Sequence, residues 1–162
     1  MDREVKMPNI VMHHHFGKVV YSALSDEVKK SIGYIDLYDF ATTGPDSFEK
    51  IHFFNNKNNN DHKLFSEQMH TKKSKDFFMK MIEMARVDYH MFSYLCGFVT
   101  HYFLDVYTNP FIFHLSGLYD PTDESTIEYR GMSEKLKLAY DCYVIENYYD
   151  CKPHAFRINR KI

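Results

Sequence analysis

The stretch Tyr94–Pro110, which reads YLCGFVTHYFLDVYTNP, constrains the fold more than any other part of the chain. It is apolar and aromatic almost throughout, so we expect a long helix from Asp88 to about Tyr107 that is buried on most faces. His101 and Asp105 stand within this helix, four residues apart and therefore on one face. A buried carboxylate costs on the order of several kcal/mol unless a partner compensates its charge. The pair is predicted to be either a satisfied histidine–aspartate hydrogen bond or two ligands of one metal ion.

The rest of the chain also favours helices. Glycine and proline are scarce, six and five in 162 residues, and no Asn-Gly or Asp-Gly turn separates alternating apolar runs. Further helices are predicted over residues 14–24, 26–33, 34–42, 62–70, 73–87 and 127–150, with polar loops at 53–63 and 119–126. We therefore expect an all-α fold, a single-domain helical bundle over residues 1–162. Residues 1–6 are a candidate extension, and the tail 150–162 either docks as an irregular segment or marks a truncated chain.

Composition excludes several classes of protein. The net charge is about −2, so no global basic field favours nucleic acid, although Arg157, Arg160 and Lys161 make the tail locally basic. Three cysteines without C-x-x-C spacing disfavour a disulfide framework and favour a reducing compartment. The amino-terminal residues contain no apolar segment of secretory length, and no window reaches the roughly 18 apolar residues of a membrane span. A cytoplasmic protein without a transmembrane segment is expected.

Ten histidines are many for this length. Each of the remaining candidate site residues also has an ordinary structural interpretation. His13 to His15 stand inside an apolar run, and consecutive residues of a helix point about 100° apart, so only one or two can face a common interior. Asp46 follows Gly-Pro, where a carboxylate is either a helix cap or a group that points across a bundle mouth. His70 is either a half-exposed surface residue or a ligand. His114 is predicted to be an ordinary interfacial histidine.

Four motifs stand in this order along the chain: MPNIVMHHHFGK, ATTGPDSF, EQMH and YLCGFVTHYFLDVYTNPFI. Together they resemble the motifs of the zinc-dependent phospholipase C family. MPNIVMHHHFGK resembles its opening M-P-x-x-x-T-H-x-x-F-G, and ATTGPDSF resembles its G-x-Q-G-P-D-x-F turn. EQMH resembles its small-or-Met-His helix, and YLCGFVTHYFLDVYTNPFI resembles its Y-x-x-G-F-x-x-H-x-x-L-D-x-x-x-H-P-Y-I helix. The likeness runs from Met7 to about Tyr149. It implies an all-α bundle with a polymetal site in a cleft between helices, and the single-strand-specific zinc nucleases are similar in overall plan.

The resemblance implies five metal ligands: His13, Asp46, His70, His101 and Asp105. His13 would be the amino-terminal ligand, the other four would surround a second zinc, and Asp105 would bridge both ions. Such a pair polarises a phosphoryl oxygen and lowers the pKa of a bound water. Asp46 would also act as the catalytic base that orients this water.

The sequence departs from the family at the ligands of a third metal ion. The family has a histidine one residue before the proline, where this chain has Asn109, and its H-x-x-x-E pair aligns with Ser133 and Lys137. The three losses coincide, so we interpret them as the loss of one whole site and expect about two zinc ions. The ammonium of Lys137 is hypothesised to stand where the charge of the metal was.

The implied function is that of a zinc-dependent phospholipase C-like hydrolase that cleaves a phosphodiester or phospholipid with a metal-activated water. The alternatives are a catalytically degenerate relative that acts as a metal-binding or scaffold protein, and a purely structural helical module. The expected partner is a small phosphoester or phospholipid, and the oligomeric state is not predicted. Lysines at 72, 73, 75 and 80 either contact anionic headgroups in peripheral membrane binding or form an ordinary solvated helix face.

Overall fold

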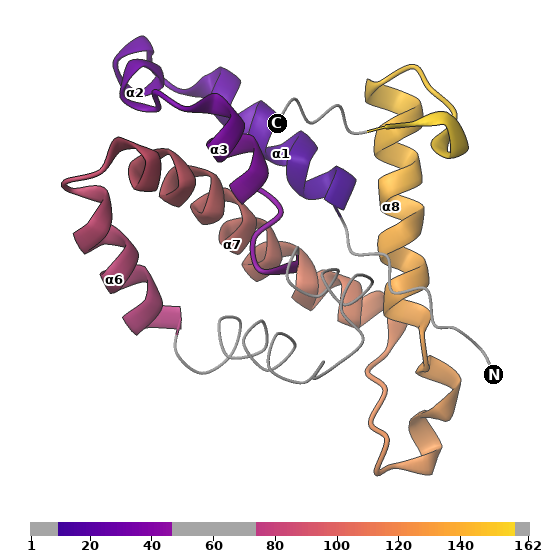
Figure 1. The fold of residues 1–162 in the computed structure, drawn as a ribbon. Coiled ribbons are helices and arrows are strands. Elements are labelled where there is room, and N and C mark those ends of the chain that lie inside the picture. The colour runs from indigo at the N-terminus through magenta and orange to yellow at the C-terminus, as the bar shows by residue number, and fades with distance from the viewer. Residues whose placement is uncertain (1–9, 47–73, 158–162) are drawn as a thin grey trace, which may run out of the picture. The chain divides into compact units, whose positions relative to one another are not determined.

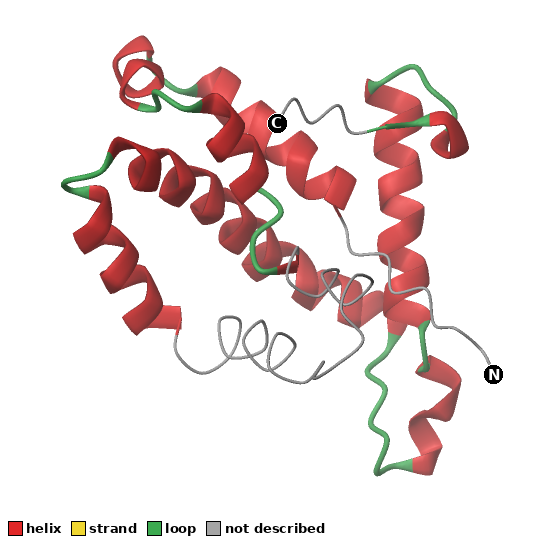
Figure 2. Cartoon of the chain, viewed as in Figure 1, coloured by secondary structure: helices red, strands yellow, loops and turns green. Residues whose placement is uncertain are grey.

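The computed structural model describes residues 10–46 and 74–157 of the chain. Every regular element in these ranges is helical, as the colours of Figure 2 show, and the prediction of an all-α fold is confirmed. The order is α1 (Ile10–Ala23), α2 (Asp26–Ser31), α3 (Ile35–Ala41), α6 (Ser74–Ala85), α7 (Tyr89–Ser116) and α8 (Met132–Tyr148), with short 3-10 helices η2 (Glu124–Tyr129) and η3 (Pro153–Ala155) (Figure 1). None of the helices in this described part is both long enough and apolar enough to cross a membrane.

The chain divides into two compact units, and the boundary runs through α1 and through α7. The terminal unit contains the described residues 10–16 and 102–157, and the central unit contains the described residues 17–46 and 74–101. Each unit has its own buried apolar cluster. The prediction of one domain over residues 1–162 stays a prediction.

In the central unit, α3 lies in close contact with α1 and α7 because glycines face it. A Cβ added to Gly97 of α7 would lie closer than 3.0 Å to the carbonyl oxygen of Tyr38, and one added to Gly17 of α1 would overlap Thr42. The buried Tyr38 hydroxyl donates a hydrogen bond to the carbonyl oxygen of Gly17 at 2.9 Å. Burial raises the pKa of Tyr38 to about 12, so the hydroxyl remains a neutral donor. The backbone of α3 is therefore held against both helices.

An aromatic cluster completes the central unit. Phe98 of α7 is its centre, with the rings of Phe77 and Phe78 from α6 at centroid distances of 5.2 and 5.6 Å. The buried members of the cluster are Ala41, Met81 and Phe98. The amphipathic helix predicted over 73–87 is observed as α6, and its apolar face supplies Phe77, Phe78 and Met81.

In the terminal unit, α1 packs against α8. Val11 forms a buried cluster with Val144 and Ile145, and partly buried side chains of the tail cover it. The Phe156 ring lies 4.9 Å from the Tyr149 ring, measured between centroids. In the described part of the tail, Cys151 and Phe156 pack against this cluster on either side of η3.

Helix α7 is longer than predicted, because it continues through Pro110 to Ser116 rather than ending near Tyr107. A proline inside a helix costs about 3 kcal/mol or more, since it removes one backbone hydrogen bond and crowds the preceding turn. Pro110 is exposed, and the following turn places Ile112 at only 1% exposure. Burial of Ile112 therefore contributes to offsetting the cost of the proline.

The other helices begin and end close to the predicted positions, with three differences. Helix α1 begins at Ile10 rather than at residue 14, and α2 ends at Ser31, two residues before Gly33. Helix α8 begins at Met132 and not at 127, because Gly131 has a φ of +73°, which no helix accommodates, and the preceding residues form η2. The N-cap of α2 is Ser25, whose side chain accepts from the Val28 N–H. The loop predicted at 53–63 and the helix predicted at 62–70 lie outside the described residues.

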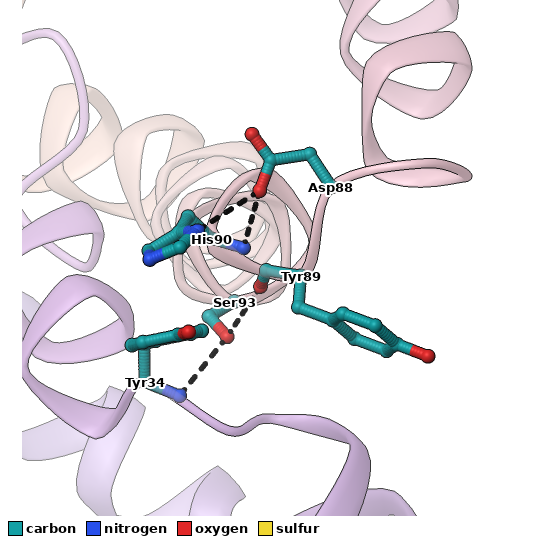
Figure 3. A network of polar contacts seen from close by, with 5 residues as sticks. All are labelled: Tyr34, Asp88, Tyr89, His90 and Ser93. Carbon is teal, nitrogen blue, oxygen red and sulfur yellow. Dashed lines mark hydrogen bonds and ion pairs between the residues drawn. The ribbon is translucent and has the colours of Figure 1, made fainter.

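A polar network joins the start of α7 to the start of α3 (Figure 3). The Ser93 hydroxyl donates to the Tyr89 carbonyl at 2.9 Å and accepts from the Tyr34 N–H at 3.2 Å. The His90 ring stacks on the Tyr34 ring at a centroid distance of 3.8 Å. The Asp88 carboxylate accepts from the His90 N–H at 2.8 Å and lies 3.1 Å from its Nδ1. These hydrogen bonds from His90 hold the pKa of Asp88 below its usual range.

Replacing Asp88 with Ala is expected to lower the melting temperature at about pH 7 and to have a smaller effect at about pH 3. A carboxyl group whose pKa is lower in the folded chain stabilises the fold above its unfolded pKa of about 3.9, and this contribution is lost as the pH falls through the folded pKa. Thermal unfolding followed by circular dichroism at both pH values measures the difference. Asp76→Ala, at an exposed position in the first turn of α6, is the control. A difference from wild type that is equal at the two pH values contradicts the expectation.

Candidate metal centre

The first two members of the candidate centre, His13 and Asp105, both belong to the terminal unit. His13 lies in the first turns of α1, and its side chain is 1% exposed. Its Nε2 atom lies 3.4 Å from Oδ1 of Asp105 on α7, whose side chain is 13% exposed. An imidazole and a carboxylate from two helices, far apart in the sequence, are therefore in direct contact.

The third member, His101, precedes Asp105 by one turn of α7. His101 is the last residue of the central unit in this helix, but the helix is continuous, so helical geometry determines where it lies relative to Asp105. Its exposure is 2%. One ligand atom from each of His13, His101 and Asp105 can be chosen so that all three lie within 4.8 Å of one another.

These three residues offer ligand types that a metal ion such as zinc accepts. Zinc prefers imidazole nitrogen and carboxylate oxygen at about 2.0–2.1 Å, and two ligands of a tetrahedral ion at that distance are about 3.3 Å apart. The 3.4 Å between His13 Nε2 and Asp105 Oδ1 agrees with this separation. A tetrahedral ion held by three protein ligands keeps a fourth position for water or substrate. The group formed by His13, His101 and Asp105 could therefore bind a metal ion.

The predicted Gly-Pro turn after α3 packs directly against the His101 ring. Gly44 has a φ of +53°, in the left-handed region that favours glycine, and a Cβ at this position would overlap Cδ2 and Cγ of His101. The Phe98 ring lies 6.1 Å from the His101 ring, measured between centroids. The backbone of the turn and an aromatic side chain thus restrict the orientation of the imidazole.

Asp46, the fourth predicted ligand that the structure describes, is not in this group. Asp46 is half-buried and stands two residues after Gly44, but it is not one of the three residues whose ligand atoms lie within 4.8 Å of one another. His70 lies outside the described residues. The structure brings together three of the five residues, and the roles of Asp46 and His70 stay predictions.

The other candidate histidines lie in different environments. His14 is buried, and His15 packs on the Tyr148 ring at a centroid distance of 4.4 Å. His114 is exposed in the last turn of α7. Of the three consecutive histidines, His13 is the one that belongs to the candidate centre.

The positions aligned with the ligands of the third metal lie on α7 and α8. Asn109 is half-buried on α7, and Lys137 is half-buried on α8. The Ser133 hydroxyl donates to the Glu134 carboxylate at 2.9 Å. The substitution of a metal charge by the Lys137 ammonium stays a hypothesis.

Asp141 of α8 is a residue near the centre that was not predicted from the sequence. Its carboxylate accepts hydrogen bonds from the Met12 N–H at 3.0 Å and from the Val11 N–H at 3.5 Å. The sequence contained one signal, because Asp141 shares its helical face with Val144 and Ile145, and a carboxylate on an apolar face requires a partner. The identity of that partner is not contained in the local pattern.

No family model matches the chain, and no match is found among curated proteins or solved structures. The resemblance to the zinc-dependent phospholipase C family therefore stays a prediction that depends on the four motifs of the sequence. The grouping of His13, His101 and Asp105 comes from the structure and does not depend on that resemblance.

Proposed function

We propose that the chain is a zinc-dependent phosphoric-ester hydrolase of the phospholipase C-like type, with a phosphodiester or phospholipid as substrate. The observation that carries the proposal is the convergence of His13, His101 and Asp105 from two helices. Two imidazoles and one carboxylate are the protein ligands of many catalytic zinc sites. The order of the four sequence motifs supports the choice of phosphoric esters among the reactions that zinc catalyses.

In this proposal, His13 and His101 bind one ion through ring nitrogens and Asp105 binds it through a carboxylate oxygen. This differs from the family resemblance, which implies that His13 and His101 bind two different ions bridged by Asp105. When bound, zinc polarises a phosphoryl oxygen and makes water more acidic. Asp105 is the most exposed of the three groups, and this supports access to the centre from its side. A second zinc ion, with His70 as a further ligand, belongs to the same proposal.

Asp46 is proposed to accept a proton from the attacking water as the general base. Its place in the chain supports this role, because the turn that precedes it packs through Gly44 against the His101 ring. Asp46 is half-buried and not fully enclosed.

The second candidate is a catalytically degenerate relative that binds metal or acts as a scaffold. Ser133 and Lys137 on α8 favour it, because neither a hydroxyl engaged by Glu134 nor an ammonium is a zinc ligand of the family type. Such a protein would bind zinc at the candidate centre without turnover.

Hydrolysis of a nitrophenyl phosphodiester and of phosphatidylcholine vesicles by the zinc-loaded chain separates these candidates. In the hydrolase, Asp46→Asn is expected to lower kcat about 100-fold or more, as for the loss of a general base. Asp36→Asn, at an exposed position in the first turn of α3, is the matched control and should leave kcat unchanged.

Zinc bound in stoichiometric amount without hydrolysis of either substrate would support the degenerate relative. A chain that takes up no zinc after reconstitution contradicts both candidates and favours the purely structural helical module. Activity that survives in Asp46→Asn contradicts the proposed base.

A further inference from the structure

We infer that Asp141 is a positioning residue for His13, an inference that rests on the proposed function. The carboxylate of Asp141 lies at the start of α1, where it accepts the Met12 N–H at 3.0 Å and the Val11 N–H at 3.5 Å. Asp141 is only 6% exposed, and all three residues belong to the terminal unit. The next residue of α1 after these two hydrogen-bonded residues is His13.

A cap of this kind is unusual because it comes from a distant part of the chain. The first amides of a helix have no acceptor inside the helix, and a neighbouring serine, threonine or aspartate normally supplies one. Here the acceptor lies on α8, 129 residues after Met12. The positive end of the α1 dipole and the two charge-assisted hydrogen bonds compensate the burial of the carboxylate.

The cap determines the position of α1 on α8 and not only its stability. The side chain of Val11 packs with Val144 and Ile145, one turn along α8 from Asp141, so a polar and an apolar contact hold the same end of α1. The Met12 amide belongs to the residue directly before His13. Metal ligation tolerates deviations of only about 0.2 Å in ligand distance, so a displaced α1 would weaken binding by His13.

This inference gives α8 a role that differs from direct ligation. The two positions of α8 that the family resemblance aligns with zinc ligands are Ser133 and Lys137. Asp141 is not in the three-residue group either, and its oxygens face backbone amides. In this chain α8 would act on the centre through the placement of α1.

The test compares Asp141→Leu and Asp141→Asn in the whole chain. Leu has a similar volume and no acceptor, whereas Asn keeps one carbonyl acceptor for the Met12 N–H and presents an NH₂ to the Val11 N–H. Asp123→Leu is the matched control, because Asp123 also accepts a backbone N–H, that of Ser125, at the start of η2, which carries no candidate ligand.

Two measurements report on positioning. In the metal-loaded protein, Asp141→Leu should weaken zinc binding about tenfold or more, which corresponds to about 1.4 kcal/mol. It should also change the visible absorption of the cobalt-substituted centre, and Asp141→Asn should restore most of the affinity. In the metal-free protein, Asp141→Leu should accelerate amide hydrogen exchange at Val11 and Met12, and Asp141→Asn at Val11 alone. The Asp123→Leu control should alter neither the affinity nor these exchange rates.

Wild-type zinc affinity and an unchanged cobalt spectrum in folded Asp141→Leu overturn the inference. Unchanged exchange at Val11 in Asp141→Asn overturns it as well, and this readout remains if the Leu variant does not fold. If the wild-type chain binds no zinc while exchange at Val11 and Met12 accelerates as expected, the proposed function fails but the anchoring of α1 by Asp141 is supported.

Discussion

Asp105→Asn is expected to weaken zinc binding by more than about 100-fold. The substitution replaces the anionic ligand of the candidate centre with a neutral amide of the same shape, beside His13 at 3.4 Å and one turn after His101. Even residues that only hydrogen-bond to metal ligands change affinity by about 10–100-fold when they are replaced. The loss of a direct ligand should exceed that range.

Competition with a chromophoric chelator measures the affinity, and thermal unfolding gives an independent readout. A ligand at 100 times its Kd raises the free energy of unfolding by about 2.7 kcal/mol, so zinc should raise the melting temperature of the wild type and not that of Asp105→Asn. Glu146→Gln, an exposed carboxylate on α8, is the control and should respond to zinc like the wild type.

A different outcome would identify the contact between His13 and Asp105 as structural. If zinc leaves the wild-type melting temperature unchanged, and Asp105→Asn is destabilised without any metal, then the contact with His13 is a structural hydrogen bond. If the Asp105→Asn chain binds zinc with wild-type affinity, Asp105 is not a ligand of the candidate centre.

Gly97→Ala is expected to destabilise the chain by about 3 kcal/mol, at the upper end of the usual cost of overpacking. In the middle of a helix, alanine is normally more stable than glycine by about 0.5–1 kcal/mol. At this position the added Cβ would overlap the carbonyl oxygen of Tyr38 and lie 2.9 Å from the Cβ of Ala41. A backbone atom cannot rotate away as a side chain can, so α3 would have to separate from α7. The clash should therefore reverse the sign of the usual effect.

For a chain of this size, about 3 kcal/mol corresponds to a fall of about 6–12 °C in the melting temperature. Gly33→Ala is the matched control, because a Cβ there meets no atom within 4 Å and the φ of Gly33 is outside the left-handed region. Circular dichroism melts of the three proteins make the comparison. A Gly97→Ala chain that is as stable as the wild type would show that α3 and α7 separate at little cost.

Local patterns account for most of the helices that were predicted. The amphipathic period of residues 73–87 and the Ser25 cap contain the information for α6 and α2, because both depend on contacts within a few residues. The predicted end of α7 near Tyr107 was wrong. The cost of Pro110 is local, whereas the burial of Ile112, which helps to offset that cost, depends on the rest of the fold.

The sequence by itself determined the all-α class, the Gly-Pro break after α3 and the common helical face of His101 and Asp105. These features follow from backbone geometry over one or two turns. Only the tertiary structure decided that His13 joins that face, that the Gly44 turn packs on the His101 ring and that Asp141 caps α1. Each of these contacts joins segments far apart in the chain, and their pairing depends on how whole helices pack, which the local periodicity of the sequence does not encode.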